Sequence, residues 1–269
     1  MMMDENLRAL ESHLKTEFPI AVAVSGGVDS MTLAVVTHRL MPDRACVFHA
    51  VSPAVPPEAT ERVKRYAASE GWVLTIVDTG EFRDTDYIRN PVDRCFYCKT
   101  NLYGAIASRT DAGIVSGANT DDLGEYRPGL NAAKDHNVRH PYIECGLSKP
   151  AVRAISHALG LTDLAELPAA PCLASRIETG IEIQPETLER VHTVEKLVTQ
   201  SLSPMTVRCR VRSRGVVVEL DNESLRRMTD LQSRSLCREV ARIFKGVSGI
   251  GKIHFETYRT GSAFVGDKS

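Results

Sequence analysis

The chain has 269 residues, of which 43% are hydrophobic and 25% are charged, the balance of a soluble globular protein. The formal net charge of −1 gives no overall attraction to nucleic acids. The N-terminal segment carries early acids, and no apolar run reaches the length of a signal peptide or a membrane span. We therefore expect a cytoplasmic protein that binds neither membranes nor nucleic acids.

Apolar strands alternate with helices over about the first 170 residues, which predicts an α/β fold with a parallel, doubly wound sheet. Ligands of such sheets lie at the carboxyl ends of the strands, beside a switch in strand order. In chain order we expect a helix over 4–17, a strand over 20–24, a helix over 29–40, a strand over 44–50, a helix over 57–70, a strand over 72–77, a helix over 94–108, a strand over 112–117 and a helix over 148–159.

The pattern changes after Pro171. The expected elements are then a helix over 185–202, strands over 205–212 and 215–220, a helix over 223–244 and a strand over 251–257. We therefore predict two domains, formed by residues 1–175 and by residues 176–269, and the second is a smaller α+β domain.

A glycine-rich loop of sequence SGGVDS follows the first predicted strand. Gly26 and Gly27 let the backbone turn and approach a ligand without obstruction by Cβ atoms. Ser25, Ser30 and the first N–H groups of the following helix can cradle an anion. The carboxylate of Asp29 is suited to hold a Mg²⁺ ion beside the phosphates. The Walker pattern is absent, so the loop predicts a nucleotide-phosphate site of another type.

Three of the seven cysteines form a candidate metal or redox site. Cys95 and Cys98 make a C-x-x-C pair, and Cys172 lies in the segment PCLASR. Three thiolate ligands on one metal or cluster leave a position open for chemistry. A zinc site completed by His136 or His140, a redox pair and buried thiols are the alternatives.

Polar residues follow the fourth predicted strand, at the sheet edge where a nucleotide would lie. Asn119, Asp121 and Asp122 suit ribose or metal binding, and the alternative is a capped turn. Arg127 suits the phosphates, and the alternative is a surface ion pair.

Three arginines alternate with apolar residues in the strand expected over 205–212. Because side chains alternate along a strand, Arg208, Arg210 and Arg212 share one face. Guanidinium groups bind phosphate well, so this face suits a substrate phosphate. The alternative is a solvated sheet face.

Several segments together resemble the LarE family, the ATP-dependent sulfur transferases that assemble the nickel-pincer nucleotide cofactor of lactate racemase. The resemblance covers nearly the whole chain. It is carried by residues 25–30, 94–99 (RCFYCK), 117–122 (GANTDD), 125–129 (EYRPG), 171–176 (PCLASR), 210–212 (RVR) and 259–262 (RTGS).

The resemblance implies a PP-loop ATP pyrophosphatase fold, similar to that of adenine nucleotide alpha hydrolases. It implies that ATP, with Mg²⁺, adenylates a carboxylate of a pyridinium mononucleotide, and that sulfur then displaces AMP to leave a thiocarboxylate. The first domain would carry out adenylation, and the second would bind substrate and form oligomers. The nucleotide would bind at Ser25, Gly26, Gly27, Asp29, Ser30, Gly117, Asn119, Asp121 and Arg127, the chemistry would use Cys172, Asp29, Ser175 and Arg176, and the substrate phosphate would meet Arg210, Arg212 and Arg259.

Family members differ in their source of sulfur. Some donate the sulfur of one cysteine, which matches Cys172, and are consumed. Others have three cysteines, which match Cys95, Cys98 and Cys172, and hold a [4Fe-4S] cluster, so we expect this type here. The resemblance also implies a homo-oligomer, such as a hexamer.

Other readings stay open on the residues alone. A PP-loop amide synthetase uses the same adenylation, but 269 residues leave no room for a glutaminase domain. A PP-loop enzyme that thiolates tRNA would call for a strongly basic surface. A nucleotide-binding module stabilised by zinc is the non-enzymatic alternative.

Overall fold

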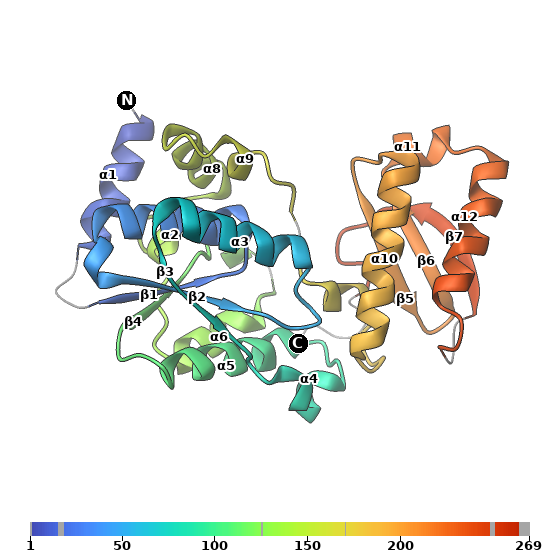
Figure 1. Ribbon diagram of the computed structural model, residues 1–269, viewed down its shortest axis with the longest axis horizontal. Helices are drawn as coiled ribbons and strands as arrows, with labels where there is room; N and C mark the ends of the chain where they lie inside the picture. Colours follow the sequence, from blue (N-terminus) through green and yellow to red (C-terminus); the bar gives the residue numbers. More distant parts are fainter. Residues whose placement is uncertain (1, 16–18, 125, 170, 248–250, 264–269) are drawn as a thin grey trace. The chain divides into compact units, whose positions relative to one another are not determined.

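The computed structural model describes residues 2–15, 19–124, 126–169, 171–247 and 251–263. Two compact units make up the chain (Figure 1). Unit 1 consists of Met1–Glu81 and Cys95–Ala170, and unit 2 consists of Phe82–Arg94 and Pro171–Ser269. No described helix combines the length and the apolar character that a membrane crossing needs.

Unit 1 is built on a four-stranded sheet with the order β3-β2-β1-β4, and every neighbouring pair is parallel. The central strand β1 has the sequence IAVAV and is buried throughout, as expected for a parallel strand covered on both faces. The strand order switches direction at β1, and proteins of this fold bind their ligands at the carboxyl end of the strands beside such a switch. The strands are β1 (Ile20–Val24), β2 (Ala45–Ala50), β3 (Val73–Val77) and β4 (Gly113–Ser116).

Helices cover both faces of this sheet, which confirms the doubly wound fold (Figure 1). Val22 and Val47 pack in one core cluster with α2, α3 and α8, whereas Ala23 and Phe48 pack in another with α5 and α6. The helices of unit 1 are α1 (Met2–Leu14), α2 (Val28–Leu40), α3 (Pro57–Glu70), α5 (Arg94–Ala107, which begins in unit 2), α6 (Pro128–Asp135), α7 (Pro141–Glu144), α8 (Lys149–Ala158) and α9 (Thr162–Ala165), with short 3-10 turns η1 (Pro42–Arg44), η2 (Glu81–Arg83, shared with unit 2) and η3 (Thr120–Gly124).

Local sequence explains several helix ends. Helix α3 starts with Pro57, whose fixed φ suits the first turn, and stops before Gly71, which has a φ of 73°. Gly160, with a φ of 77°, follows α8 in the same way. The helix predicted over 4–17 spans Met2–Leu14, and residues 16–18 lie outside the described residues.

Unit 2 contains a three-stranded mixed sheet with the order β5-β6-β7, as expected for the smaller α+β domain. The β5–β6 pair is antiparallel and the β6–β7 pair is parallel. Helix α10 packs on β5, and α12 packs on β7. The elements of unit 2 are α4 (Thr85–Ile88), η4 (Leu173–Arg176), α10 (Pro185–Leu202), β5 (Val207–Arg212), β6 (Gly215–Leu220), α11 (Asn222–Arg227), α12 (Asp230–Ile243) and β7 (Lys252–Thr257).

The single helix predicted over 223–244 is wrong, because two helices occupy this segment. Helix α11 ends at Arg227, and α12 begins at Asp230. Thr229 caps α12 in a capping box, in which its side chain accepts the N–H of Gln232 and the Gln232 side chain accepts the N–H of Thr229. This reciprocal capping stabilises a new helix start at Asp230, so the segment forms two helices rather than one.

The two units are not separated by the single domain boundary that we predicted between residues 175 and 176. The segment Phe82–Arg94 belongs to unit 2, because Asn90 is fully buried there and its side-chain amide donates to the carbonyls of Glu178 and Ile181, at 2.8 and 2.9 Å. Buried backbone carbonyls need such donors, so a residue remote in sequence fixes this segment to unit 2.

Candidate functional site

The SGGVDS loop connects β1 to the first turn of α2. The Ser30 hydroxyl accepts the Ser25 N–H at 3.0 Å and lies 3.2 Å from the Ser25 hydroxyl. Gly27 stands at the N-cap position of α2, and no side chain caps the helix there. The helix start therefore presents N–H groups and the positive end of a helix dipole, which favour an anion.

Two glycines in this region are required by close packing. Gly26 has a φ of 81°, and a Cβ atom there would lie 2.8 Å from the Ala59 carbonyl oxygen on α3. A Cβ atom on Gly117 would lie 2.7 Å from the Ser30 nitrogen. The segment after β4 therefore touches the first turn of α2, and only glycine allows this approach.

The predicted nucleotide residues gather around Asp29. The Asn119 side chain, which is 3% exposed, donates to Asp29 Oδ1 at 3.3 Å, and its own oxygen accepts the Asp121 N–H at 3.0 Å. Lys149 Nζ forms an ion pair with Asp29 Oδ2, and the Lys149 N–H donates to Asp121 at 3.1 Å. We call Asp29, Asn119, Asp121 and Lys149 the Asp29 cluster.

Lys149 was missed in the sequence, where it marked only the start of a helix. Lys149 and Asp29 are 120 residues apart in the sequence, and no local sequence pattern predicts an ion pair over that distance. Tyr142 was missed as well. Its hydroxyl donates to the Asp29 carbonyl at 3.0 Å, and complete burial raises the pKa of Tyr142 well above its usual value, so the tyrosine is a neutral donor.

Arg127 lies at the edge of this region and is exposed. It forms an ion pair with Asp122 at 2.8 Å, and Asp122 also accepts the Asn119 N–H at 3.0 Å. Arg127 thus connects to the Asp29 cluster through Asp122. Glu125, which belongs to the motif EYRPG, lies outside the described residues.

In unit 2, Arg176 holds the segment that contains Cys172. Its guanidinium makes a two-pronged ion pair with Glu195, at 2.9 and 3.0 Å. Its Nη1 donates to the carbonyls of Pro171 and Cys172 and to the Ser175 hydroxyl. Arg176 and Ser175 are both buried, whereas Cys172 is exposed. Arg176 therefore orients the backbone that presents the Cys172 thiol.

Two of the three arginines of β5 are paired with acids, whereas Arg208 donates to the Val207 carbonyl and lies over the Tyr258 ring. Arg210, which is 4% exposed, binds Glu219 at 3.0 Å and the Ser175 carbonyl at 2.9 Å. Arg212 binds Glu219 at 2.6 Å, but its Nε atom is buried without a partner among the described residues. Arg259 is exposed. Arg212 also binds Glu256 at 3.5 Å, so its Nε is the donor of this guanidinium that is left for a ligand.

Cys95 and Cys98 lie in the first two turns of α5, three residues apart, so both face the same side of the helix. Both are partly buried. Cys172 belongs to unit 2, where it precedes η4. Across the described part of the chain, no group of three or more His, Cys, Asp or Glu side chains is arranged to hold a metal ion.

No protein-family model matches the chain. It is 36% identical over 225 residues to an uncharacterized protein of Synechocystis sp., covering 82% of each chain. It is 24% identical over 230 residues to an uncharacterized protein of Methanocaldococcus jannaschii, covering 83% of this chain and 87% of that relative. It is 28% identical over 217 residues to the pyridinium-3,5-bisthiocarboxylic acid mononucleotide synthase of Lactiplantibacillus plantarum, covering 78% of each chain.

These similarities, together with a glycine-rich loop at the switch point of a doubly wound sheet, define a PP-loop α/β protein. The chain belongs to the LarE family, which confirms the resemblance seen in its motifs.

Proposed function

We propose that this protein is an ATP-dependent sulfur transferase of the PP-loop type. It adenylates a carboxylate of a pyridinium dicarboxylate mononucleotide and releases pyrophosphate, and sulfur then replaces AMP to give a thiocarboxylate. The observation that carries this proposal is the Asp29 cluster beside the SGGVDS loop. The name of the L. plantarum relative, a bisthiocarboxylic acid mononucleotide synthase, supports the product class.

The Asp29 cluster fits the first step, in which a substrate carboxylate attacks the α-phosphorus of ATP. Asp29 and Asp121 are carboxylates of the kind that hold Mg²⁺. When bound, Mg²⁺ offsets negative charge on the phosphates. Asp29 and Asp121 would hold the ion, and the Lys149 ammonium, which pairs with Asp29, would neutralise phosphate oxygens.

Sulfur then attacks the carbonyl carbon of the acyl-adenylate, and AMP leaves. Cys172 is exposed, and Arg176 fixes the backbone around it. The thiols of Cys95, Cys98 and Cys172 are the donor set that a [4Fe-4S] cluster takes. Such a cluster would be held by these three thiols and would supply the sulfur for the transfer.

The substrate phosphate is proposed to bind at Arg210, Arg212 and Arg259, and Glu219 pairs with the first two of these. The buried Nε of Arg212, which has no partner among the described residues, supports this assignment, because a buried donor without an acceptor is costly. By family analogy we also propose a homo-oligomer, which sedimentation of the purified protein tests.

The test of the first step is release of pyrophosphate and AMP from ATP in Asp29→Asn and Lys149→Met variants. We expect both rates to fall by about 100-fold or more, since charge stabilisation at the phosphates is lost. Asp43→Asn, at an exposed acid before β2, serves as the matched control and should keep the wild-type rate. Pyrophosphate release at the wild-type rate in Asp29→Asn would refute the site.

A further inference from the structure

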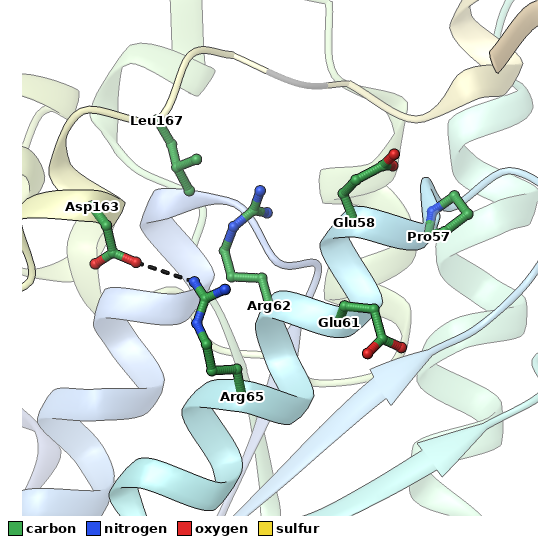
Figure 2. Close-up of a pocket in the computed structure, with 7 residues that line it drawn as sticks. All are labelled: Pro57, Glu58, Glu61, Arg62, Arg65, Asp163 and Leu167. Atoms are coloured by element: carbon green, nitrogen blue, oxygen red, sulfur yellow. Dashed lines mark hydrogen bonds and ion pairs between the residues drawn. The ribbon is translucent and has the colours of Figure 1, made fainter. Parts of the chain in front are cut away.

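A pocket of about 580 Å³ lies in unit 1, lined by residues of α3 and α9 and by Leu167 (Figure 2). Arg65 pairs with Asp163 there at 3.3 Å, and Arg62 donates to the Gly26 carbonyl at 2.7 Å. This pocket therefore belongs to the surroundings of the SGGVDS loop. The charged side chains on the sheet of unit 2 form a separate group.

In unit 2, these charged side chains gather on one face of the sheet. The register places Glu219 of β6 between Arg208 of β5 and Glu256 of β7. His254 comes two residues before Glu256, and side chains two residues apart on a strand share a face. The sheet thus sets the arginines of β5 beside two acids and a histidine.

Glu219 is fixed in its place on this face. Its side chain is 1% exposed, and it accepts from Arg210 at 3.0 Å, from Arg212 at 2.6 Å and from the Ser262 hydroxyl at 2.6 Å. Moving a buried carboxylate away from three donors is costly. Glu219 is therefore a permanent counter-ion of the two arginines.

Glu256 is held more loosely. Its side chain is 43% exposed, and its contact with Arg212 is long, at 3.5 Å. Its Oε1 lies 2.8 Å from His254 Nε2, which is the donor because an ionised carboxylate can only accept. This hydrogen bond and the positive charges of Arg212 and Arg259 lower the pKa of Glu256, so it is ionised at neutral pH. Exposed ion pairs contribute little to stability, so Glu256 can leave its partners at low cost.

The charge of this face matches a phosphate monoester when Glu256 is left out. The three arginines proposed for the substrate phosphate, set against Glu219, leave two positive charges, and an ionised Glu256 reduces these to one. A phosphate monoester carries a charge of about −1.5 to −2 near pH 7 and presents three acceptor oxygens. A carboxylate has one charge and two oxygens, so the phosphate is the better partner for these donors.

We propose that Glu256 is a specificity-determining residue, which competes with the substrate phosphate for Arg212 and His254. The inference rests on the proposed function, because it concerns the phosphate of that substrate. When the phosphate binds, the Glu256 carboxylate moves into solvent, and Arg212 Nη1 and His254 Nε2 donate to phosphate oxygens instead. Ligands with less negative charge do not displace Glu256, so the carboxylate excludes them.

The test is calorimetric titration of the whole protein at neutral pH with three probes. They are nicotinic acid mononucleotide, which is a pyridinium carboxylate with a phosphate monoester, its methyl phosphodiester, and its riboside, which lacks the phosphate. In Glu256→Gln we expect the mononucleotide to bind about 10-fold more tightly, the effect of removing one like charge beside a bound anion. The diester should also bind more tightly, whereas the affinity for the riboside stays within about twofold of wild type.

Glu223→Gln is the matched control. Glu223 is an exposed acid of unit 2 on α11, where it pairs with Arg227. Its substitution removes the same charge from the unit but not from the sheet face, so all three affinities should stay within about twofold of wild type. Glu256→Ala is a second variant that removes the carboxylate, and it should also bind the mononucleotide more tightly than the wild type.

Two results would overturn the inference. One is unchanged or weaker binding of the mononucleotide in both Glu256 variants, because Glu256 would then support the arginines rather than compete for them. The other is an equal gain in Glu223→Gln, which would be an effect of overall charge. In both cases the wild-type protein still prefers the mononucleotide to the riboside. Equal binding of those two probes to the wild type would instead refute the proposed phosphate site, and the inference with it.

Discussion

Asp29 and Lys149 illustrate what can be read at the scale of single residues. Asp29 was predicted, because it belongs to a six-residue motif whose chemistry is local. Its ion pair with Lys149 was not predicted, because Lys149 lies 120 residues further along the chain, at the start of α8.

His49 gives a prediction at this scale. It is fully buried at the end of β2, its Nδ1 donates to the Val24 carbonyl, and its Nε2 accepts from the Thr60 hydroxyl, both at 2.9 Å. Burial lowers the pKa of His49 below its usual value. Below about pH 6.5, His49 therefore binds a proton more readily in the unfolded chain than in the folded protein.

We expect the free energy of unfolding to fall as pH drops from about 6.5 towards 5, and this dependence to be weaker in His49→Gln. His140, whose pKa burial also lowers, contributes in the same direction and should leave a residual slope. Urea unfolding at several pH values measures the effect. An unchanged slope in His49→Gln would show that His49 does not contribute.

At the scale of elements, the strands of unit 1 were predicted to within two residues at each end. Buried parallel strands are short, continuous apolar runs, and these are visible in the sequence. The segment 118–147 carried only site residues in the prediction, yet it contains η3, α6 and α7. These elements are short, so they lack the long apolar period that identifies a helix.

Gly117 gives the prediction at this scale, because it follows β4 and packs against the start of α2. In Gly117→Ala the new methyl group would meet the backbone of Asp29 and Ser30, at 2.9 and 2.7 Å, and backbone atoms cannot move aside cheaply. We expect a loss of about 1–3 kcal/mol in stability, the usual cost of overpacking, together with weaker ATP binding.

Gly124→Ala is the control for that variant, because a Cβ atom there meets nothing within 4 Å. It should keep both stability and ATP affinity, as thermal unfolding and nucleotide titration would show. Equal behaviour of the two variants would mean that the contact of Gly117 with α2 does not matter.

At the scale of the whole molecule, the sequence predicted two domains but not their composition. The chain enters unit 2 at Phe82, leaves it after Arg94 and returns at Pro171. This excursion depends on Asn90, whose left-handed backbone, with a φ of 54°, is typical of asparagine but does not reveal the partners of its side chain. The three candidate cysteines are consequently spread over both units.

The cysteines give the prediction at this scale. Anaerobically purified protein should contain about four irons and four sulfides per chain, the content of one [4Fe-4S] cluster. Cys95→Ala should lose most of both, whereas Cys145→Ala, at another partly buried thiol, should keep them. Full iron content in Cys95→Ala, or one zinc without iron, would contradict the cluster. Turnover that stops after one thiocarboxylate per chain would instead support donation from Cys172.

The adenylate is the central claim, and the most direct measurement follows the oxygen atoms of the substrate carboxylate. The pyridinium dicarboxylate mononucleotide is labelled with oxygen-18 in its carboxylates and incubated with the protein, magnesium ATP and a sulfur source. If the carboxylate attacks the α-phosphorus and sulfur then displaces AMP, one labelled oxygen appears in each AMP, as mass spectrometry would show. Unlabelled AMP formed alongside the thiocarboxylate, or ADP in place of AMP, would contradict the account.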